Sequence, residues 1–154
     1  MNKKNNNIVL SIRSIIKNDI DQIINIENQS NPNPWSRKIF EKELLIINSI
    51  HLAGISNNQI VTYIFSWIVH DELHIHNIAT HPIFRLKGFA KKILFKTIQI
   101  AKQKNVKIID LDVRESNIHA ISFYKKIGFI ENGMRNNYYS NQENAILMRY
   151  NIQQ

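Results

Sequence analysis

Apolar residues recur at two different spacings along the chain, and the changes of spacing mark the expected elements. Alternating or continuous apolar runs predict strands over residues 8–13, 50–56, 60–70, 73–80, 107–113, 129–134 and 145–150. Apolar residues three and four apart predict helices over 17–28, 36–47, 90–104 and 117–127. Ser36 is a suitable N-cap for the second of these helices, and Gly128 stops the last one.

The order of these elements predicts a mixed α/β sheet flanked by about four helices. Sequential strands with short turns between residues 50 and 80 form an antiparallel meander. The strand 73–80, the helix 90–104 and the strand 107–113 form a crossover unit, so these two strands are expected to be parallel. The chain has 154 residues with no repeat or linker, which predicts one domain over 1–154 with residues 1–7 flexible.

The composition of the chain indicates the cellular compartment and the kind of partner to expect. The absence of cysteine excludes disulfides and thiolate chemistry and favours a reducing compartment, so the cytoplasm is the expected location. Apolar runs are too short to span a membrane. Arg13 interrupts the apolar run near the start of the chain, which argues against a signal peptide. The formal charge of +8 suggests an anionic partner, but the lysines are scattered and do not form a nucleic-acid-binding stripe.

The segment RLKGFAKK, residues 85–92, lies between a predicted strand and the longest predicted helix. A helix N-terminus offers unpaired N–H groups and a partial positive charge, which suit a phosphate. Gly88 allows close approach of the backbone, and Lys87 and Lys91 add charge. An ordinary loop with solvated lysines explains the same residues, so phosphate binding and the plain loop remain equal alternatives here.

The segment LDVRESNIHAISFYKKIGF, residues 111–129, joins a strand to a helix. Asp110 and Asp112 occupy alternate positions and therefore share one face of that strand. Asn117 and Tyr124 lie on one face of the helix, near the end of the strand. A carboxylate and a phenol thus converge at the carboxyl ends of two parallel strands, the usual ligand crevice of such sheets. Without further context, a packing role explains Tyr124 better than a catalytic one.

Four histidines invite a metal hypothesis, because His74 and His76 share a strand face near His70 and His81. These histidines have no acidic or cysteine partner at ligand spacing in the sequence. We therefore expect no metal site.

In combination, these motifs resemble those of a known family. Arg85-x-x-Gly88-x-Ala90 opening a helix, followed by the segment 111–129, resembles the GCN5-related N-acetyltransferase (GNAT) family. More narrowly, NPWS, HNIATHP, VRESN, FYKKIGF and RNNYY occur in an order that resembles the RimI branch, over about residues 8–152. Enzymes of that branch acetylate the N-terminal alanine of small-subunit ribosomal protein number eighteen. The resemblance implies an acetyltransferase that uses acetyl-coenzyme A and that ribosomal protein; we expect a monomer, with no DNA or membrane partner.

The resemblance also implies roles for individual residues. The backbone of Ile78, Ala79 and Thr80 would hold the acetyl-pantetheine arm, and Tyr124 would protonate the leaving thiolate. The remaining coenzyme A contacts would come from Arg85, Leu86, Lys87, Gly88, Phe89, Ala90, Lys91 and Asn117. The acceptor peptide would be lined by Trp35, Tyr138 and Tyr139.

The chain departs from the family at the proton acceptor, where the family has glutamate and this chain has Asp112. Aspartate is shorter by one carbon–carbon bond, about 1.5 Å, and a water can span that gap. We therefore expect Asp112 to act as a water-relayed base, with Asp110 and Glu115 in reserve. Three alternatives stay open: an acetyltransferase for another N-terminus, a lysine or a small amine; a fold that binds coenzyme A without turnover; and a basic RNA-binding module.

Overall fold

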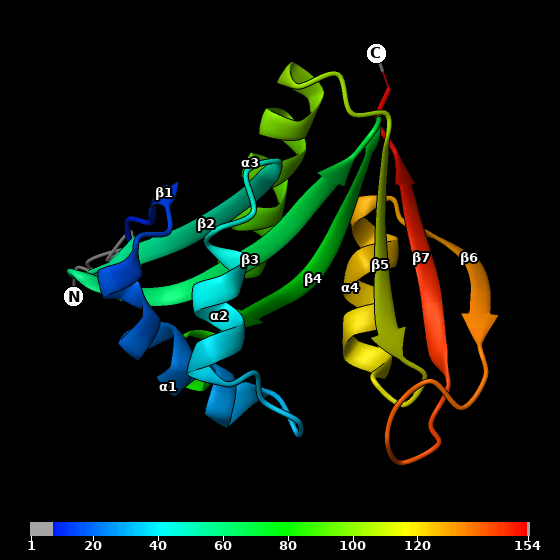
Figure 1. Cartoon of the computed structure of the whole chain (residues 1–154), viewed down its shortest axis with the longest axis horizontal. Helices are drawn as coiled ribbons and strands as arrows, with labels where there is room; N and C mark the ends of the chain where they lie inside the picture. The colour runs from blue at the N-terminus through cyan, green and yellow to red at the C-terminus, as the bar shows by residue number, and fades with distance from the viewer. Residues whose placement is uncertain (1–7, 154) are drawn as a thin grey trace, which may run out of the picture.

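A computed structural model describes residues 8–153, and its elements follow the expected order (Figure 1). The expectation for residues 1–7 lies outside the described residues. The strands are β1 (Ser11–Ser14), β2 (Ser49–Ser56), β3 (Gln59–Val69), β4 (Glu72–Thr80), β5 (Ile108–Arg114), β6 (Ile130–Arg135) and β7 (Ala145–Asn151). The helices are α1 (Ile20–Ser30), α2 (Arg37–Glu43), α3 (Phe89–Gln103) and α4 (Ile118–Ile127), with short 3-10 turns η1 (Lys17–Asp19) and η2 (Pro82–Phe84).

The strands form one mixed sheet in the order β1-β2-β3-β4-β5-β7-β6. The predicted crossover is confirmed: β4 and β5 pair in parallel, from Glu72↔Ile108 to Ile75↔Leu111. Among residues 8–153, the other neighbouring pairs are antiparallel, including the predicted β6–β7 hairpin. Past the Ile75↔Leu111 pair, β4 and β5 diverge, so the sheet splits toward their carboxyl ends (Figure 1).

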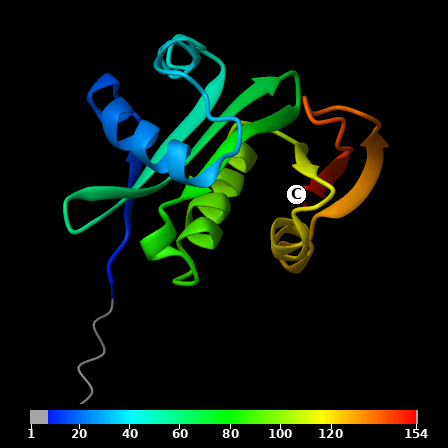
Figure 2. The same ribbon diagram turned by 90° about the horizontal axis from the view of Figure 1, so that it is seen from below.

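Helices cover both faces of the sheet (Figure 2). The apolar stripe of α3, which includes Ile93 and Leu94, packs with Ile109 and Leu111 of β5 in the larger core cluster. On the opposite face, α1 and α2 pack on β2 and β3 in a second cluster. This second cluster contains Ile15, Ile20, Ile23, Ile26, Phe40, Ala53, Ile60, Tyr63 and Phe65. The larger cluster spans both halves of the split sheet, whereas the second cluster packs only on the half that contains β2 and β3.

The second helix is shorter than the sequence predicted. It ends at Glu43 rather than near Ile47, although Ser36 is its N-cap as expected. Leu45 is 78% exposed and Ile47 is 99% exposed, so neither side chain packs against the rest of the fold. Without tertiary contacts to stabilise another turn, the apolar run does not extend the helix.

The N-terminal elements also begin later than predicted. Strand β1 starts at Ser11 rather than Ile8, and helix α1 starts at Ile20 rather than Lys17. The carboxylate of Asp19 accepts the N–H of Ile16 over 2.8 Å, which caps the 3-10 turn that replaces the first helical turn. No helix among residues 8–153 is both long and apolar enough to cross a membrane.

Candidate active site

A cleft of about 1400 Å³ opens where β4 and β5 diverge. Its walls come from the α1–α2 loop, the carboxyl half of β4, the loop before α3, the end of β5, the first turns of α4 and the β6–β7 loop. The sequence-predicted residues that line it are Trp35, Ile78, Ala79, Thr80, Arg85, Leu86, Gly88, Phe89, Ala90, Lys91, Asp112, Asn117, Tyr124, Tyr138 and Tyr139. Segments far apart in the sequence therefore meet at one place.

The edge of β4 forms one side of the cleft. Residues from His76 to Thr80 continue past the last β4–β5 pair, so their backbone groups on that edge face the cleft instead of a strand. On the other side, β4 remains paired with β3 up to Thr62↔Thr80, and the hydroxyl of Thr62 donates to the carbonyl of Ala79 over 2.9 Å. The edge is thus fixed and can offer hydrogen bonds to an extended ligand.

The loop before α3 brings a helix N-terminus to the cleft. Gly88 is the N-cap residue with φ +79°, and a Cβ there would meet nothing within 4 Å. The Arg85 guanidinium donates to the carbonyl of Thr80 over 3.2 Å and to the Ser30 hydroxyl over 3.1 Å. Lys87 is the exception among the predicted residues: its amine lies over the Phe84 ring, 5.2 Å from the centroid, and does not line the cleft.

Asp112 is the candidate base that faces the cleft. Its side chain is 29% exposed and lies 3.8 Å from Arg135, measured from Oδ1 to Nε. The two reserve carboxylates are occupied elsewhere. Asp110 binds Arg149 with two hydrogen bonds of 2.7 and 2.6 Å, and Glu115 accepts a hydrogen bond from Asn144 over 3.0 Å.

Tyr124 lies on α4 and is 6% exposed, with its ring against Phe123 and Phe129. Burial raises the pKa of the Tyr124 phenol well above its usual range, so the hydroxyl keeps its proton at physiological pH. Asn117 is the N-cap of α4, and its side chain accepts the N–H of Ala120 over 3.2 Å. The cap fixes the start of the helix that carries Tyr124 into the cleft.

Glu27 is a buried carboxylate that sequence reasoning missed, and it also lines the cleft. It accepts hydrogen bonds from the Tyr63 hydroxyl, the Asn77 amide (3.1 Å) and the N–H of Trp35 (3.0 Å), as well as from Asn31 (3.1 Å). The carboxylate joins the α1–α2 loop to β4. A signal was present, because Glu27 continues the apolar stripe of α1, where a solvated charge would not be placed.

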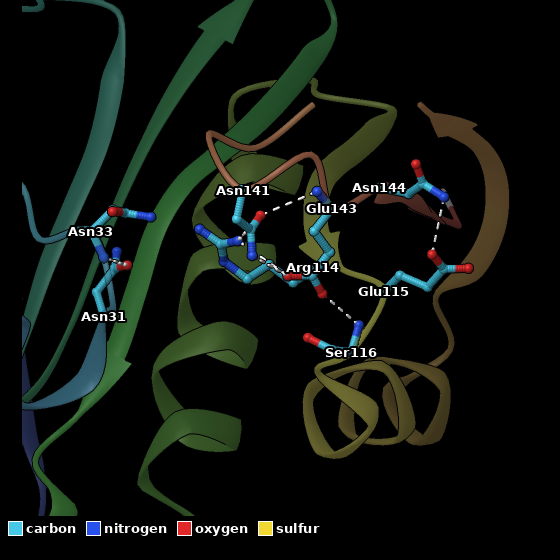
Figure 3. A network of polar contacts seen from close by, with 8 residues as sticks. All are labelled: Asn31, Asn33, Arg114, Glu115, Ser116, Asn141, Glu143 and Asn144. Atoms are coloured by element: carbon cyan, nitrogen blue, oxygen red, sulfur yellow. Dashed lines mark hydrogen bonds and ion pairs between the residues drawn. The ribbon is translucent and has the colours of Figure 1, made fainter. Parts of the chain in front are cut away.

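Contacts to the end of β5 hold the β6–β7 loop over the cleft (Figure 3). Glu143 accepts hydrogen bonds from the N–H of Ser116 (2.8 Å) and from Arg114 (3.2 Å), and the Arg114 guanidinium stacks 3.9 Å from the Tyr139 ring centroid. Hydrogen bonds from Ser116, with further ones from Arg114 and Asn141, lower the pKa of Glu143 to about 2. This ionised carboxylate fixes the loop that carries Tyr138 and Tyr139.

One of these histidines, His74, has acidic neighbours that the sequence did not reveal. Glu72, His74 and Asp110 place ligand-type atoms within 4.8 Å of one another, and His74 lies 3.4 Å from Glu72. The premise of no acidic partner is therefore wrong for His74. Asp110 is held by Arg149 through both carboxylate oxygens, and the expectation of no metal site stays a prediction.

The cleft combines a candidate proton acceptor, a candidate proton donor and a helix N-terminus at the open end of a parallel strand pair. Such a site suits a transferase that moves a group from a phosphorylated carrier. Residues 20–129 match the Acetyltransferase (GNAT) family, and the chain belongs to that family. It is thus an acyltransferase, as the motifs predicted.

Individual proteins are similar to the chain over most of its length. The [Ribosomal protein bS18]-alanine N-acetyltransferase of Haemophilus influenzae is 38% identical over 134 residues, which cover 84% of this chain and 90% of that protein. The crystal structure of the ribosomal-protein-S18-alanine N-acetyltransferase from Escherichia coli matches with a TM-score of 0.89 and 28% identity, over 95% of this chain and 96% of that one. Ard1 from Thermoplasma volcanium has the same fold, with a TM-score of 0.90 at 24% identity over 94% and 99% of the two chains.

Proposed function

We propose that this chain transfers the acetyl group of acetyl-coenzyme A to the N-terminal alanine amine of ribosomal protein bS18. The observation that carries the proposal is the cleft between β4 and β5, which joins the α3 N-terminus to Asp112 and Tyr124. The relatives with this name cover nearly the whole chain. We also infer that the reaction takes place in the cytoplasm, where a cysteine-free chain and ribosomal proteins are both expected.

Coenzyme A would bind at the α3 N-terminus and along the edge of β4. Its pyrophosphate suits the α3 N-terminus, where Gly88 leaves open space and Lys91 lines the cleft. Its pantetheine arm carries amides that suit the free edge of β4 from Ile78 to Thr80. The thioester would then lie between the diverging strands, close to Tyr124 and Asp112.

The acceptor would enter between the two loops that hold Trp35 and the Tyr138–Tyr139 pair. The Trp35 ring packs 5.4 Å from the Phe40 ring, and the Tyr139 ring packs 5.2 Å from the Tyr138 ring. Both loops are fixed, one by Glu27 and the other by Glu143. Because both loops are fixed, the acceptor slot does not have to be ordered on binding.

The chemistry also favours an N-terminal amine. An α-amine has a pKa near 7.8, so roughly a tenth is neutral at pH 7, whereas a lysine amine is neutral about once in a few thousand molecules. The base therefore has little thermodynamic work with an α-amine and must only collect one proton. Asp112, acting through a water, would meet that need, and Tyr124 would donate a proton to the departing thiolate.

The test uses two peptides and acetyl-coenzyme A. One peptide begins Ala-Arg with a free α-amine and also carries an internal lysine, and the other is identical but has its α-amine blocked. Mass spectrometry of fragments locates the added acetyl group. We expect acetylation at the first alanine and none of the blocked peptide. Transfer to lysine in both peptides would favour the lysine alternative, and no transfer to either would contradict the proposal.

A further inference from the structure

His76 lies at an irregularity of β4 beside the cleft. Strands β3 and β4 pair as Ser66↔Ile75 and then Phe65↔Asn77, so His76 is the extra residue of a β-bulge. The side chain is exposed and lines the cleft. Bulges occur often beside active sites, where they redirect a side chain.

The register places His76 and Asp112 on the same face of the sheet, at the edge of the cleft. In the parallel β4–β5 pair, His74 is opposite Asp110 and Ile75 is opposite Leu111. Two residues further along each strand, His76 and Asp112 lie beyond the last β4–β5 pair, on the same face of the sheet and on opposite sides of the gap where the strands separate. The His74 and His76 rings are 6.4 Å apart and nearly parallel, which confirms that the bulge leaves both histidines on one face. His76 and Asp112 therefore open into the same part of the cleft.

The surroundings keep the His76 imidazole uncharged. Its ring lies 4.2 Å from the Trp67 ring, and partial desolvation, with His74 and His51 nearby, lowers the pKa of His76. The Trp67 indole, against which the His76 ring lies, donates a hydrogen bond to the carboxylate of Glu43 at the end of α2 over 2.6 Å. His51, by contrast, uses both ring nitrogens within the fold. A neutral imidazole can accept a proton at one nitrogen and donate one from the other.

We propose that His76 is a further catalytic residue, which carries the proton of the acceptor amine to Asp112. This inference rests on the proposed function. The amine nitrogen forms a bond to the acetyl carbon as the carbon–sulfur bond breaks, one amine proton passes to a ring nitrogen of His76, and the other ring nitrogen releases its proton to Asp112. The imidazole takes the place of the relay water and spans the distance lost by having aspartate instead of glutamate.

Paired variants test the relay. We expect His76→Gln and Asp112→Asn each to lower kcat about 10- to 100-fold with little change in the KM for acetyl-coenzyme A. The double variant should be no slower than the slower single variant, because both residues serve one step. His74→Gln, two residues earlier on the same face and outside the cleft, should stay within about two-fold of wild type.

Two further measurements separate catalysis from packing and from the proposed function. Added imidazole should restore part of the activity of His76→Ala, whereas 1,2,4-triazole, similar in shape but far less basic, should not. NMR of the His76 ring nitrogens should show a shift between wild type and Asp112→Asn, whether or not the protein acetylates a peptide. The relay is overturned if His76→Gln keeps nearly full activity, if the two losses multiply in the double variant, or if the ring signals do not respond. If the protein has no transferase activity but the His76 ring signals respond to Asp112→Asn, the proposed function is contradicted. The pairing of His76 with Asp112 is then still supported.

Discussion

The backbone N–H of Trp35 donates a hydrogen bond of 3.0 Å to the carboxylate of Glu27, which is buried beneath the cleft. The same carboxylate binds Asn77 on β4 and the Tyr63 hydroxyl. One side chain thus sets the position of the α1–α2 loop relative to the strand that would hold the acetyl donor. The two substrates of a transfer reaction must be held at a precise distance and orientation. A fixed α1–α2 loop would therefore help to align the acceptor with the acetyl donor.

Removal of the Glu27 carboxylate should therefore affect both stability and the acceptor site. Glu27→Ala leaves several buried donors without a partner, at about 1–3 kcal/mol for each that stays unsatisfied. We expect a loss of at least about 2 kcal/mol in urea unfolding, and a higher KM for the peptide with an unchanged KM for acetyl-coenzyme A. Asn28→Ala, exposed on the same helix, is the control and should stay within about 0.5 kcal/mol. Equal behaviour of the two variants would contradict this role.

Tyr124→Phe separates proton donation from packing. The ring stays in place, so the affinity for coenzyme A measured by calorimetry should change less than about two-fold. Without the hydroxyl, single-turnover transfer should slow about 10²-fold, a typical value for acid–base assistance. Tyr150→Phe, whose ring packs 5.3 Å from Phe129, is a matched control on β7. A large loss of affinity in Tyr124→Phe would instead support a packing role.

The contact between Glu143 and Ser116 should make loop stability depend on acid pH. The pKa of Glu143 falls from 4.5 to about 2 in the folded protein, so its contribution is fully present above pH 4.5 and is lost as the pH falls toward 2. Thermal unfolding of wild type and Glu143→Gln should differ most above pH 4.5, and the two should converge near pH 2. A difference that stays constant from pH 7 to pH 2.5 would show that the carboxylate is not held this way.

Asp112 is the most specific of the site predictions. Asp112→Ala should lower kcat about 10²-fold near pH 7, because a cleft-facing proton acceptor is lost. Glu115→Ala and Asp110→Asn should keep transfer within about three-fold, since Asn144 and Arg149 hold those carboxylates away from the cleft. Rates are compared per folded protein, because Asp110→Asn also weakens its contact with Arg149. A loss of only a few-fold in Asp112→Ala would contradict its role as base.

Much of the fold could be predicted because its strongest signals are local. The apolar periodicity of α3 and the runs of β4 and β5 predicted the parallel pair, and the turn residues predicted the hairpins. The predicted end of α2 was wrong. The apolar residues Leu45 and Ile47 continue a helical pattern in the sequence, but they are exposed and have nothing to pack against. The local pattern of apolar residues does not show whether a segment has anything to pack against.

The site was predicted where its residues lie in contiguous motifs, and it was missed where they do not. Glu27 binds Asn77, 50 residues away, and Glu143 binds Ser116, 27 residues away. His76 becomes notable only when the bulge and the end of the β4–β5 pairing bring it to the same cleft as Asp112. Pairings between distant segments depend on register, which a single sequence does not specify residue by residue.

Acetylation of a protein N-terminus in the cleft is tested most directly by the position of the acetyl group on a peptide with two competing amines. Wild-type protein, acetyl-coenzyme A and a peptide that begins Ala-Arg and contains an internal lysine are incubated at pH 7 and analysed by fragment mass spectrometry. We expect acetylation of the α-amine of the first alanine, with the lysine unmodified. Acetyl on the lysine with a free N-terminus, or an unmodified peptide, would contradict it.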